Sequence, residues 1–441
     1  MACRELPCGT PSAQVYDLDR EGRGVARVGG KTVFVSGALP GEEVRVRYQR
    51  AHARFDEGVV DEVLRPSPER VTPRCPHFGT CGGCKLQHLV HDAQVRAKQA
   101  QLAGVLRAHA GLEPERWLDP LSAHPWGYRR SARLGVRYVP QKGGALVGFR
   151  EIRSSRVAVL EGCDVLHPSA GARVQALRAL VNELKARRRI PQIAVAVGDA
   201  ETALVFRHLV PLGPEDRATL IAFARQHELR VYLQPAGPQS ITALWPENPG
   251  PLRYGLPEFE LEFLFEPADF IQVNAEVNRL LVSRAVALLA PEPSERVLDL
   301  FCGLGNFTLA IARRAGEVLG LEGEVALVER ARTNARHNAI GNAAFASADL
   351  ATGTDFERQW AGRWHKLILD PPRTGAARIV DNLRTPYPER IVYVSCNPAT
   401  LARDAAVLVK RHGFYLAAAG AVDMFPHTAH TEAITVFQRA S

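Results

Sequence analysis

The 441-residue sequence predicts an α/β protein with three domains, and three observations carry that prediction. Short alternating runs separated by glycines fill residues 14–64, a pattern typical of a small β-barrel. From about residue 267, apolar strand-like runs alternate with helix-like runs, which predicts a doubly wound, mostly parallel sheet. Proline-rich stretches at 66–73 and 235–251 enclose a mixed α+β region. We therefore expect domains at 1–68, 69–266 and 267–441.

Composition excludes several classes of protein. With 46% hydrophobic and 23% charged residues, the chain can bury substantial cores, which excludes a disordered or fibrous protein. It contains no apolar run near the roughly 18 residues that a membrane span needs, and its N-terminus lacks a signal pattern. We expect a cytoplasmic protein without a membrane partner. In that reducing compartment, the eight cysteines are better explained as metal ligands or catalytic thiols than as disulfides.

The five predicted barrel strands cover 14–19, 24–28, 31–39, 42–50 and 55–64. Outward arginines on and after the fourth strand, at 45, 47, 50 and 54, are candidates for contacts with a phosphate backbone. Net charge supports a polyanionic partner, because residues 1–240 carry +11 and residues 241–441 carry −3 of the total of +8. Arginine supplies most of the basic residues, so a compositional habit of the organism is the alternative explanation.

The middle region combines both kinds of element. Strands are expected near 132–138, 145–149 and 193–197, and helices near 91–109, 170–188 and 214–227. We expect the first of these helices to pack on the C-terminal domain.

A cysteine cluster opens the middle region. Cys75, Cys81 and Cys84 follow Cys-x5-Cys-x2-Cys spacing with glycines between them, and Cys163 is the candidate fourth ligand. Four thiolates suit either zinc or an iron–sulfur cluster. Three ligands in one loop and a remote fourth favour the cluster, since structural zinc sites usually pair their cysteines. Unrelated buried thiols are the remaining alternative.

Three features of the C-terminal domain predict a nucleoside site. The segment from Asp299 to Phe307 ends a strand and opens a helix with glycines that permit close approach to a ligand. Glu322 ends the next strand, where a carboxylate accepts hydrogen bonds from ribose hydroxyls. Asp349 is placed for an adenine amino group. S-adenosylmethionine fits better than NAD, because the third glycine of the dinucleotide motif is missing.

Further strand ends carry reactive groups. Asp370 precedes two prolines and Arg373. Amino methyltransferases normally have an aromatic residue after such an Asp-Pro-Pro, so Arg373 argues against attack by an exocyclic amine. Cys396 follows another strand and, beside a nucleoside site, is a candidate nucleophile. Glu432 precedes the last strand and matters if a proton must be taken from carbon. Nearby His427 and His430 are better explained as structural residues.

Together these segments resemble the RNA uracil-C5 methyltransferases over nearly the whole chain. The resemblance rests on the barrel, the cysteine pattern and the segments FIQVN, DLFCGLGNFTL, LDPPR, SCNP and FPHTAHTE. It implies a Rossmann-like methyltransferase domain, an OB-like TRAM barrel and an iron–sulfur middle domain. The implied reaction is methyl transfer from S-adenosylmethionine to C5 of a uridine in 23S rRNA, by a monomeric enzyme.

The resemblance also implies residue roles. Cys396 would be the nucleophile that adds to C6, and Glu432 the general base. The cofactor and substrate site would contain Gln272, Phe301, Asn306, Glu322, Asp349 and Asp370, and a [4Fe-4S] cluster would be held by Cys75, Cys81, Cys84 and Cys163. Thr431 departs from the apolar residue expected there, and Cys3 and Cys8 have no implied role. Methylation of tRNA or another rRNA site, cytosine-C5 methylation and a non-catalytic rRNA-binding scaffold are the alternatives.

Overall fold

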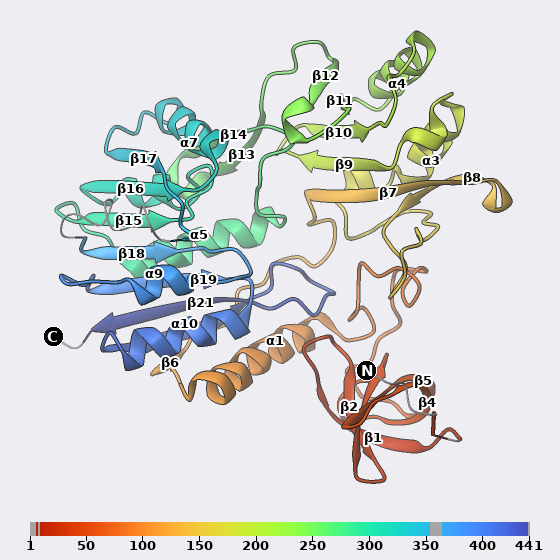
Figure 1. The fold of residues 1–441 in the computed structure, drawn as a ribbon, viewed down its shortest axis with the longest axis horizontal. Helices are drawn as coiled ribbons and strands as arrows, with labels where there is room; N and C mark the ends of the chain where they lie inside the picture. Colours follow the sequence, from red (N-terminus) through yellow and green to blue (C-terminus); the bar gives the residue numbers. More distant parts are fainter. Residues whose placement is uncertain (1–5, 8, 353–363, 440–441) are drawn as a thin grey trace.

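The computed structural model describes residues 6–7, 9–352 and 364–439. These form a barrel, a middle sheet with helices and a C-terminal sheet with helices (Figure 1). The first is a closed five-stranded barrel in the order β1-β2-β3-β5-β4. Its strands are β1 Ser12–Leu18, β2 Gly24–Val28, β3 Lys31–Ser36, β4 Glu43–Ala51 and β5 Phe55–Arg65. Alternate side chains such as Val15, Val33 and Val46 fill the interior, as the period of two requires. The barrel prediction is confirmed.

Two of the barrel arginines proposed to contact a phosphate backbone form ion pairs within the barrel. Arg45 pairs with Glu62 at 3.2 Å, and Arg47 pairs with Asp61 at 3.2 Å, both on the neighbouring strand β5. These carboxylates offset part of the positive charge on this face.

The middle region contains a six-stranded sheet in the order β12-β11-β10-β9-β7-β8. Helices α3 and α4 cover one face through an apolar core that includes Leu177, Leu180 and Leu220. The strands are β7 Ser131–Val139, β8 Gly144–Gly148, β9 Gln192–Val197, β10 Thr202–Arg207, β11 Arg230–Gln234 and β12 Thr242–Trp245; the helices are α2 Pro168–Gly171, α3 Val174–Glu183 and α4 Pro214–Gln226.

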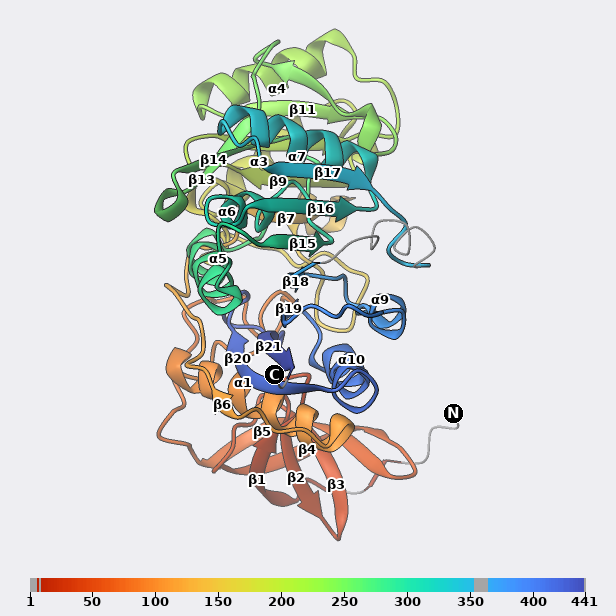
Figure 2. The same ribbon diagram turned by 90° about the vertical axis from the view of Figure 1, so that its left-hand side faces the viewer.

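The C-terminal region is an eight-stranded sheet in the order β17-β16-β15-β18-β19-β21-β20-β6, visible as a ladder in Figures 1 and 2. The first five strands are parallel, and β21 runs antiparallel to both of its neighbours. They are β15 Arg296–Leu300, β16 Glu317–Glu322, β17 Ala343–Ser347, β18 Lys366–Leu369, β19 Arg390–Ser395, β20 Phe414–Val422 and β21 Glu432–Arg439. The doubly wound, mostly parallel fold is confirmed.

Helices cover both faces of this sheet. Neighbouring residues of β15 point to opposite sides, so Val297 and Leu298 belong to different apolar cores. The helices are α5 Ala275–Leu289, α6 Thr308–Ala312, α7 Val325–His337, α9 Ala377–Asp381 and α10 Pro398–Lys410.

Two elements from earlier in the chain complete the C-terminal layer. Helix α1, His91–Val105, packs against β20, and the turn that follows it packs against α10. Strand β6, Arg116–Trp117, pairs in parallel with β20 at the edge of the sheet. Helix α1 therefore lies between this sheet and the barrel, as both views show (Figures 1 and 2).

The hairpin of β13 Leu252–Leu256 and β14 Leu261–Phe265 ends at the predicted boundary near residue 266. Its apolar side chains share one core with the middle sheet and with α5, so the hairpin joins the two regions. In the described part of the chain, no helix is long and apolar enough to cross a membrane.

Candidate active site

The loop after β15 and the end of β16 form a cradle of backbone amides. Gly303 donates to Glu322 at 3.0 Å, and Gly323 and Glu324 donate to the other carboxylate oxygen at 2.7 and 3.1 Å. These bonds fix the carboxylate at the carboxyl edge of the parallel strands, where ligands bind in open α/β sheets. Glu322 is thus oriented for ribose hydroxyl donors.

Asp299 supports this loop from beneath. It is fully buried and accepts a hydrogen bond from Thr308 at 2.5 Å, while its second carboxyl oxygen has no partner in the described structure. Burial raises the pKa of Asp299 to about 7.

Other predicted cofactor residues lie around the same edge. Phe301 directly follows β15 and has a φ of +66°, a strained value for a residue with a side chain. Asp349 is exposed two residues beyond β17, and its carboxylate accepts from the amides of Ala351 and Thr352. The Asn306 amide is occupied instead, because Tyr254 and Asn278 bond to it. Its cofactor role stays a prediction, and its visible contacts anchor the loop to β13 and α5.

Cys396 and Glu432 are brought to one sheet edge by strand pairing. The β19–β21 ladder ends with Ser395 paired to Ala433, so Cys396 directly follows, and Glu432 directly precedes, a paired residue. The two side chains lie close enough for the charge of Glu432 to act on the Cys396 thiol. Cys396 also directly precedes Asn397, which caps α10 by accepting from the Ala399 amide at 3.2 Å. Residues 36 positions apart thereby meet at one sheet edge.

The surroundings of Cys396 and Glu432 disfavour the thiolate form of the first and the carboxylate form of the second. Burial raises the pKa of the Cys396 thiol to about 11, with further increases from Glu432 and Asp370, while Arg373 opposes them. Burial likewise raises the pKa of Glu432, which is 7% exposed, to about 8. Arg373 is therefore the nearby cation that favours the ionised form of both groups.

Asp370 lies at the same edge, at the end of β18. Its amide donates to the Leu300 carbonyl at 3.3 Å, and Gln272 donates to its carboxyl group at 3.4 Å. Burial, together with the Asp299 carboxylate, raises the pKa of Asp370 to about 7. Two predicted site residues, Gln272 and Asp370, are thus brought into contact.

A cleft of about 600 Å³ lies beside this edge, with barrel residues in its wall. Arg373 lines it, and the Arg129 guanidinium lies 5.8 and 5.9 Å from the ring centres of Phe149 and Phe425, which also line it. Cationic side chains from the barrel, the cysteine loop, the middle region and the C-terminal domain meet here: Arg20, Lys85, Arg129, Arg133 and Arg373. Positive charge beside partly buried aromatic rings suits a single-stranded nucleic acid.

Comparisons with known proteins agree with this geometry. Residues 258–440 match the family model described as tRNA (Uracil-5-)-methyltransferase, and residues 12–60 match the TRAM domain. The 23S rRNA (uracil(1939)-C(5))-methyltransferase RlmD of Nitrosococcus oceani is 52% identical over 97% of this chain and 96% of its own. The protein of the same name from Alkalilimnicola ehrlichii is 51% identical over 99% and 98%. This chain belongs to the RlmD family of 23S rRNA (uracil-C5)-methyltransferases.

A solved structure shares the overall fold of this chain. The tRNA (uracil-54, C5)-methyltransferase of Pyrococcus abyssi, in complex with S-adenosyl-L-homocysteine, superposes with a TM-score of 0.74 at 25% identity. The match covers 97% of this chain and 100% of that one.

The four predicted metal-ligand cysteines line one cavity, together with Phe78, Arg129 and Phe149. Burial raises the pKa of the Cys84 thiol to about 12, and it also raises those of Cys81 and Cys163. Within the described residues, no three His, Cys, Asp or Glu side chains converge closely enough to hold one metal ion. The iron–sulfur centre therefore stays a prediction, and Cys3 lies, with Cys8, outside the described residues.

The sequence analysis missed a set of polar residues on α1. His91, Gln94, Lys98 and Gln101 share one helix face by their spacing, and each contacts the segment between β20 and β21. The sequence did contain a signal for these residues, namely a polar stripe on a helix that was expected to pack on another domain. His427, expected to be structural, donates its backbone N–H to Gln94 at 2.8 Å, and its ring lies 3.9 Å from that of Trp126 at an angle of 34°.

Proposed function

We propose that this chain transfers a methyl group from S-adenosylmethionine to C5 of a uridine in 23S rRNA, giving 5-methyluridine. The observation that carries the proposal is the β19–β21 pairing that brings Cys396 and Glu432 to one sheet edge, in a chain about half identical to 23S rRNA enzymes throughout its length. The target we favour is the uridine equivalent to position 1939, which the relatives' names specify. Lower identity to the tRNA enzyme makes tRNA the second candidate.

The residues present fit the cofactor. Glu322 would hold the ribose hydroxyls, since three amides already orient its carboxylate, and Asp349 would accept from the adenine amino group. Phe301, Asn306 and Gln272 would complete the site. When bound, S-adenosylmethionine supplies an electrophilic methyl group.

The chain's own groups explain how an unreactive carbon accepts that methyl group. The Cys396 thiolate bonds to C6 of uracil, and the C5–C6 π electrons move toward C5 and O4, which makes C5 nucleophilic. After C5 has been methylated, the Glu432 carboxylate removes its proton. The C5–C6 double bond re-forms and the C6–S bond breaks, which returns the thiolate. Asp370, held by Gln272, would hydrogen-bond the uracil edge during these steps.

The cleft explains how RNA would reach these groups. A stacked uridine must leave its neighbours, at a cost of a few kcal/mol. Phosphate contacts to the cleft arginines and stacking on Phe149 or Phe425 would offset that cost. Because nucleophile and base come from one chain, we propose that it acts as a monomer in the cytoplasm.

We also propose that Cys75, Cys81, Cys84 and Cys163 hold a [4Fe-4S] cluster. Their common cavity supports this, since four thiolates are a usual ligand set for such a cluster. No chemical step needs the cluster, so it would stabilise the middle region beside the RNA cleft.

Labelled S-adenosylmethionine and undermodified large-subunit RNA test the activity. We expect label in 5-methyluridine at the single predicted position. Absence of label would favour the scaffold, 5-methylcytidine would indicate a cytosine enzyme, and labelling of tRNA alone would reassign the substrate.

Metal analysis tests the cluster. Anaerobically purified protein should be brown and contain iron, and Cys84→Ser should remove both properties. The matched control is Cys396→Ser, which should keep the iron and lose the activity. A colourless protein that contains zinc would reject the cluster.

A further inference from the structure

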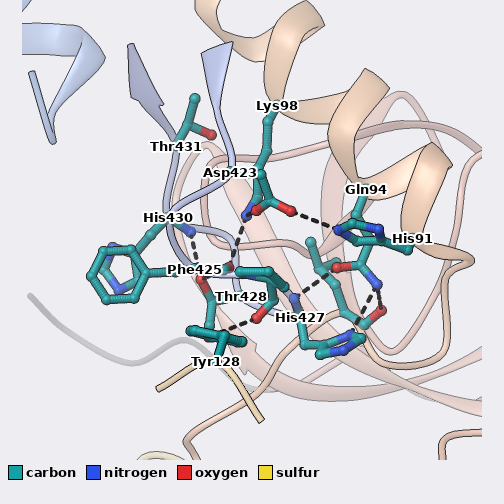
Figure 3. Close-up of polar contacts among 12 residues, drawn as sticks. His91, Gln94, Lys98, Tyr128, Asp423, Phe425, His427, Thr428, His430 and Thr431 are labelled. Carbon is teal, nitrogen blue, oxygen red and sulfur yellow. Dashed lines mark hydrogen bonds and ion pairs between the residues drawn. The ribbon is translucent and has the colours of Figure 1, made fainter. Parts of the chain in front are cut away.

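Helix α1 carries a buried lysine to the end of the sheet where Glu432 lies. Lys98 is 2% exposed, and its ammonium group donates to Asp423 at 2.5 Å and to the Phe425 carbonyl at 2.9 Å. Asp423 is 1% exposed, and its other carboxyl oxygen contacts His91 at 2.8 Å. Figure 3 shows Lys98 and His91 converging on this aspartate from one helix.

These contacts fall on the segment that presents the base. Val422 pairs with Glu432 across β20 and β21, so the connecting segment begins at Asp423 and ends at Thr431. Helix α1 holds it at further points, because Gln94 bonds to His427 and Thr431 donates to Gln101 at 2.6 Å. The departure from an apolar residue at 431 is explained by that hydrogen bond. Helix α1 thus fixes both ends of the segment.

Stability alone does not explain a charged pair at this place. Removing two charges from water is costly, and well-packed apolar residues of similar size often serve a fold equally well. Lys98 also lies close enough to Glu432 for its charge to favour the ionised carboxylate. Burial lowers the pKa of the Lys98 ammonium, and Asp423 opposes that shift.

Several groups act on Glu432 from the elements around it. Asp370 and Asp423 disfavour its ionisation, and Arg373 joins Lys98 in favouring it. The Cys396 thiol, directly after β19, lies close enough for the two groups to interact electrostatically. Lys98 is the cation in this set that comes from outside the C-terminal domain.

We propose that Lys98 is a positioning residue for Glu432, holding the segment that carries it and supplying positive charge that favours its base form. This inference rests on the proposed function. It assigns to α1, an element outside the catalytic domain, a part in the proton-removal step.

Two RNA substrates separate that step from the earlier ones. RNA with tritium on C5 of the target uridine releases tritium only when the C5 proton is removed. RNA with 5-fluorouridine cannot lose fluorine in this way, so it accumulates the methylated protein–RNA adduct and reports Cys396 addition and methyl transfer.

For Lys98→Met, we expect adduct formation within about threefold of the parent. The acid limb of the pH profile for tritium release should move up by about one pH unit, which lowers release about tenfold at pH 7 and restores it at high pH. Lys98→Arg keeps the charge and should keep the parental profile. The matched control is Lys366→Met, which breaks a buried pair with Glu295 elsewhere in the sheet and should leave the profile in place.

An unchanged midpoint in Lys98→Met, or equal losses of adduct and tritium release at every pH, would overturn the proposal. If that variant does not fold, Lys98→Met with Asp423→Asn removes both charges together. Its midpoint should also rise, by less, and a parental midpoint would overturn the proposal. A parent protein that forms no adduct and releases no tritium would instead reject the proposed function.

Discussion

Buried charged groups at the two ends of the parallel strands have different electrostatic surroundings. At the amino end, the buried side chains of Lys366 and Glu295 pair at 2.6 Å, and the more exposed Arg296 and Glu317 pair at 2.9 Å. At the carboxyl end, burial raises the pKa values of three carboxyl groups, those of Asp299, Asp370 and Glu432. The amino end satisfies its charges, whereas the carboxyl end gathers carboxyl groups that disfavour one another's ionisation. Unfavourable electrostatics of this kind marks the functional edge.

The strongest test of the functional edge is Cys396→Ala. Without the thiol no C6 adduct can form, so we expect methylation to fall by at least about 10⁴-fold and the 5-fluorouridine adduct to disappear. Methyl incorporation and gel mobility of the adduct measure both. A variant that methylates at the parental rate would remove covalent catalysis from this edge.

Glu432→Gln should separate the two halves of the reaction. Glutamine cannot accept the C5 proton, so we expect the methylated adduct to accumulate on natural uridine and turnover to fall by about 10³-fold or more. Denaturing gels with labelled RNA detect the adduct. Parental turnover in this variant would assign the base to another group.

Lys366→Met should show what the amino end contributes. Breaking a buried ion pair leaves Glu295 uncompensated, so the free energy of unfolding should fall by about 3 kcal/mol. Denaturant unfolding measures that loss, and the remaining folded protein should methylate at the parental rate. A loss of activity per folded molecule would mean that the two ends are not separable.

The smallest expected effect is a gain in stability. The folded-state pKa of Glu432, about 8, exceeds that of an unfolded glutamate, so stability falls as pH rises between the two values. Glutamine imitates the neutral carboxyl group and avoids that loss. Glu432→Gln should therefore raise Tm by about 2 °C or more at pH 9 and change it little at pH 4. An equal Tm at pH 9 would show that ionisation here costs no stability.

Sequence periodicity predicted the barrel and the doubly wound sheet, because both depend on local alternation and on strand-to-helix order. It also predicted that Glu322, Asp370 and Cys396 lie at strand ends, which places them at one edge of a parallel sheet. The pairing of β21 beside β19 could not be predicted from the sequence, so the ladder that brings Cys396 and Glu432 to one sheet edge came only from the structure.

Contacts between distant segments escaped prediction for a related reason. Lys98 and Asp423 are 325 positions apart, and no local pattern connects them. The two residues of β6 are too few to carry a periodic signal. Asn306 sits in a glycine loop that reads as a ligand site, whereas its amide bonds to Tyr254 and Asn278.

The placement of α1 against β20 has a consequence for synthesis on the ribosome. Domains near the N-terminus generally fold first, during synthesis. Helix α1 cannot do so in its final place, because it leaves the ribosome hundreds of residues before its partner strand β20. The polar face of α1, which is buried in the folded protein, therefore stays exposed to solvent until nearly the whole polypeptide has been made. The nascent protein acquires a closed catalytic edge only at the end of translation, so premature termination anywhere upstream of β20 yields no partially active enzyme.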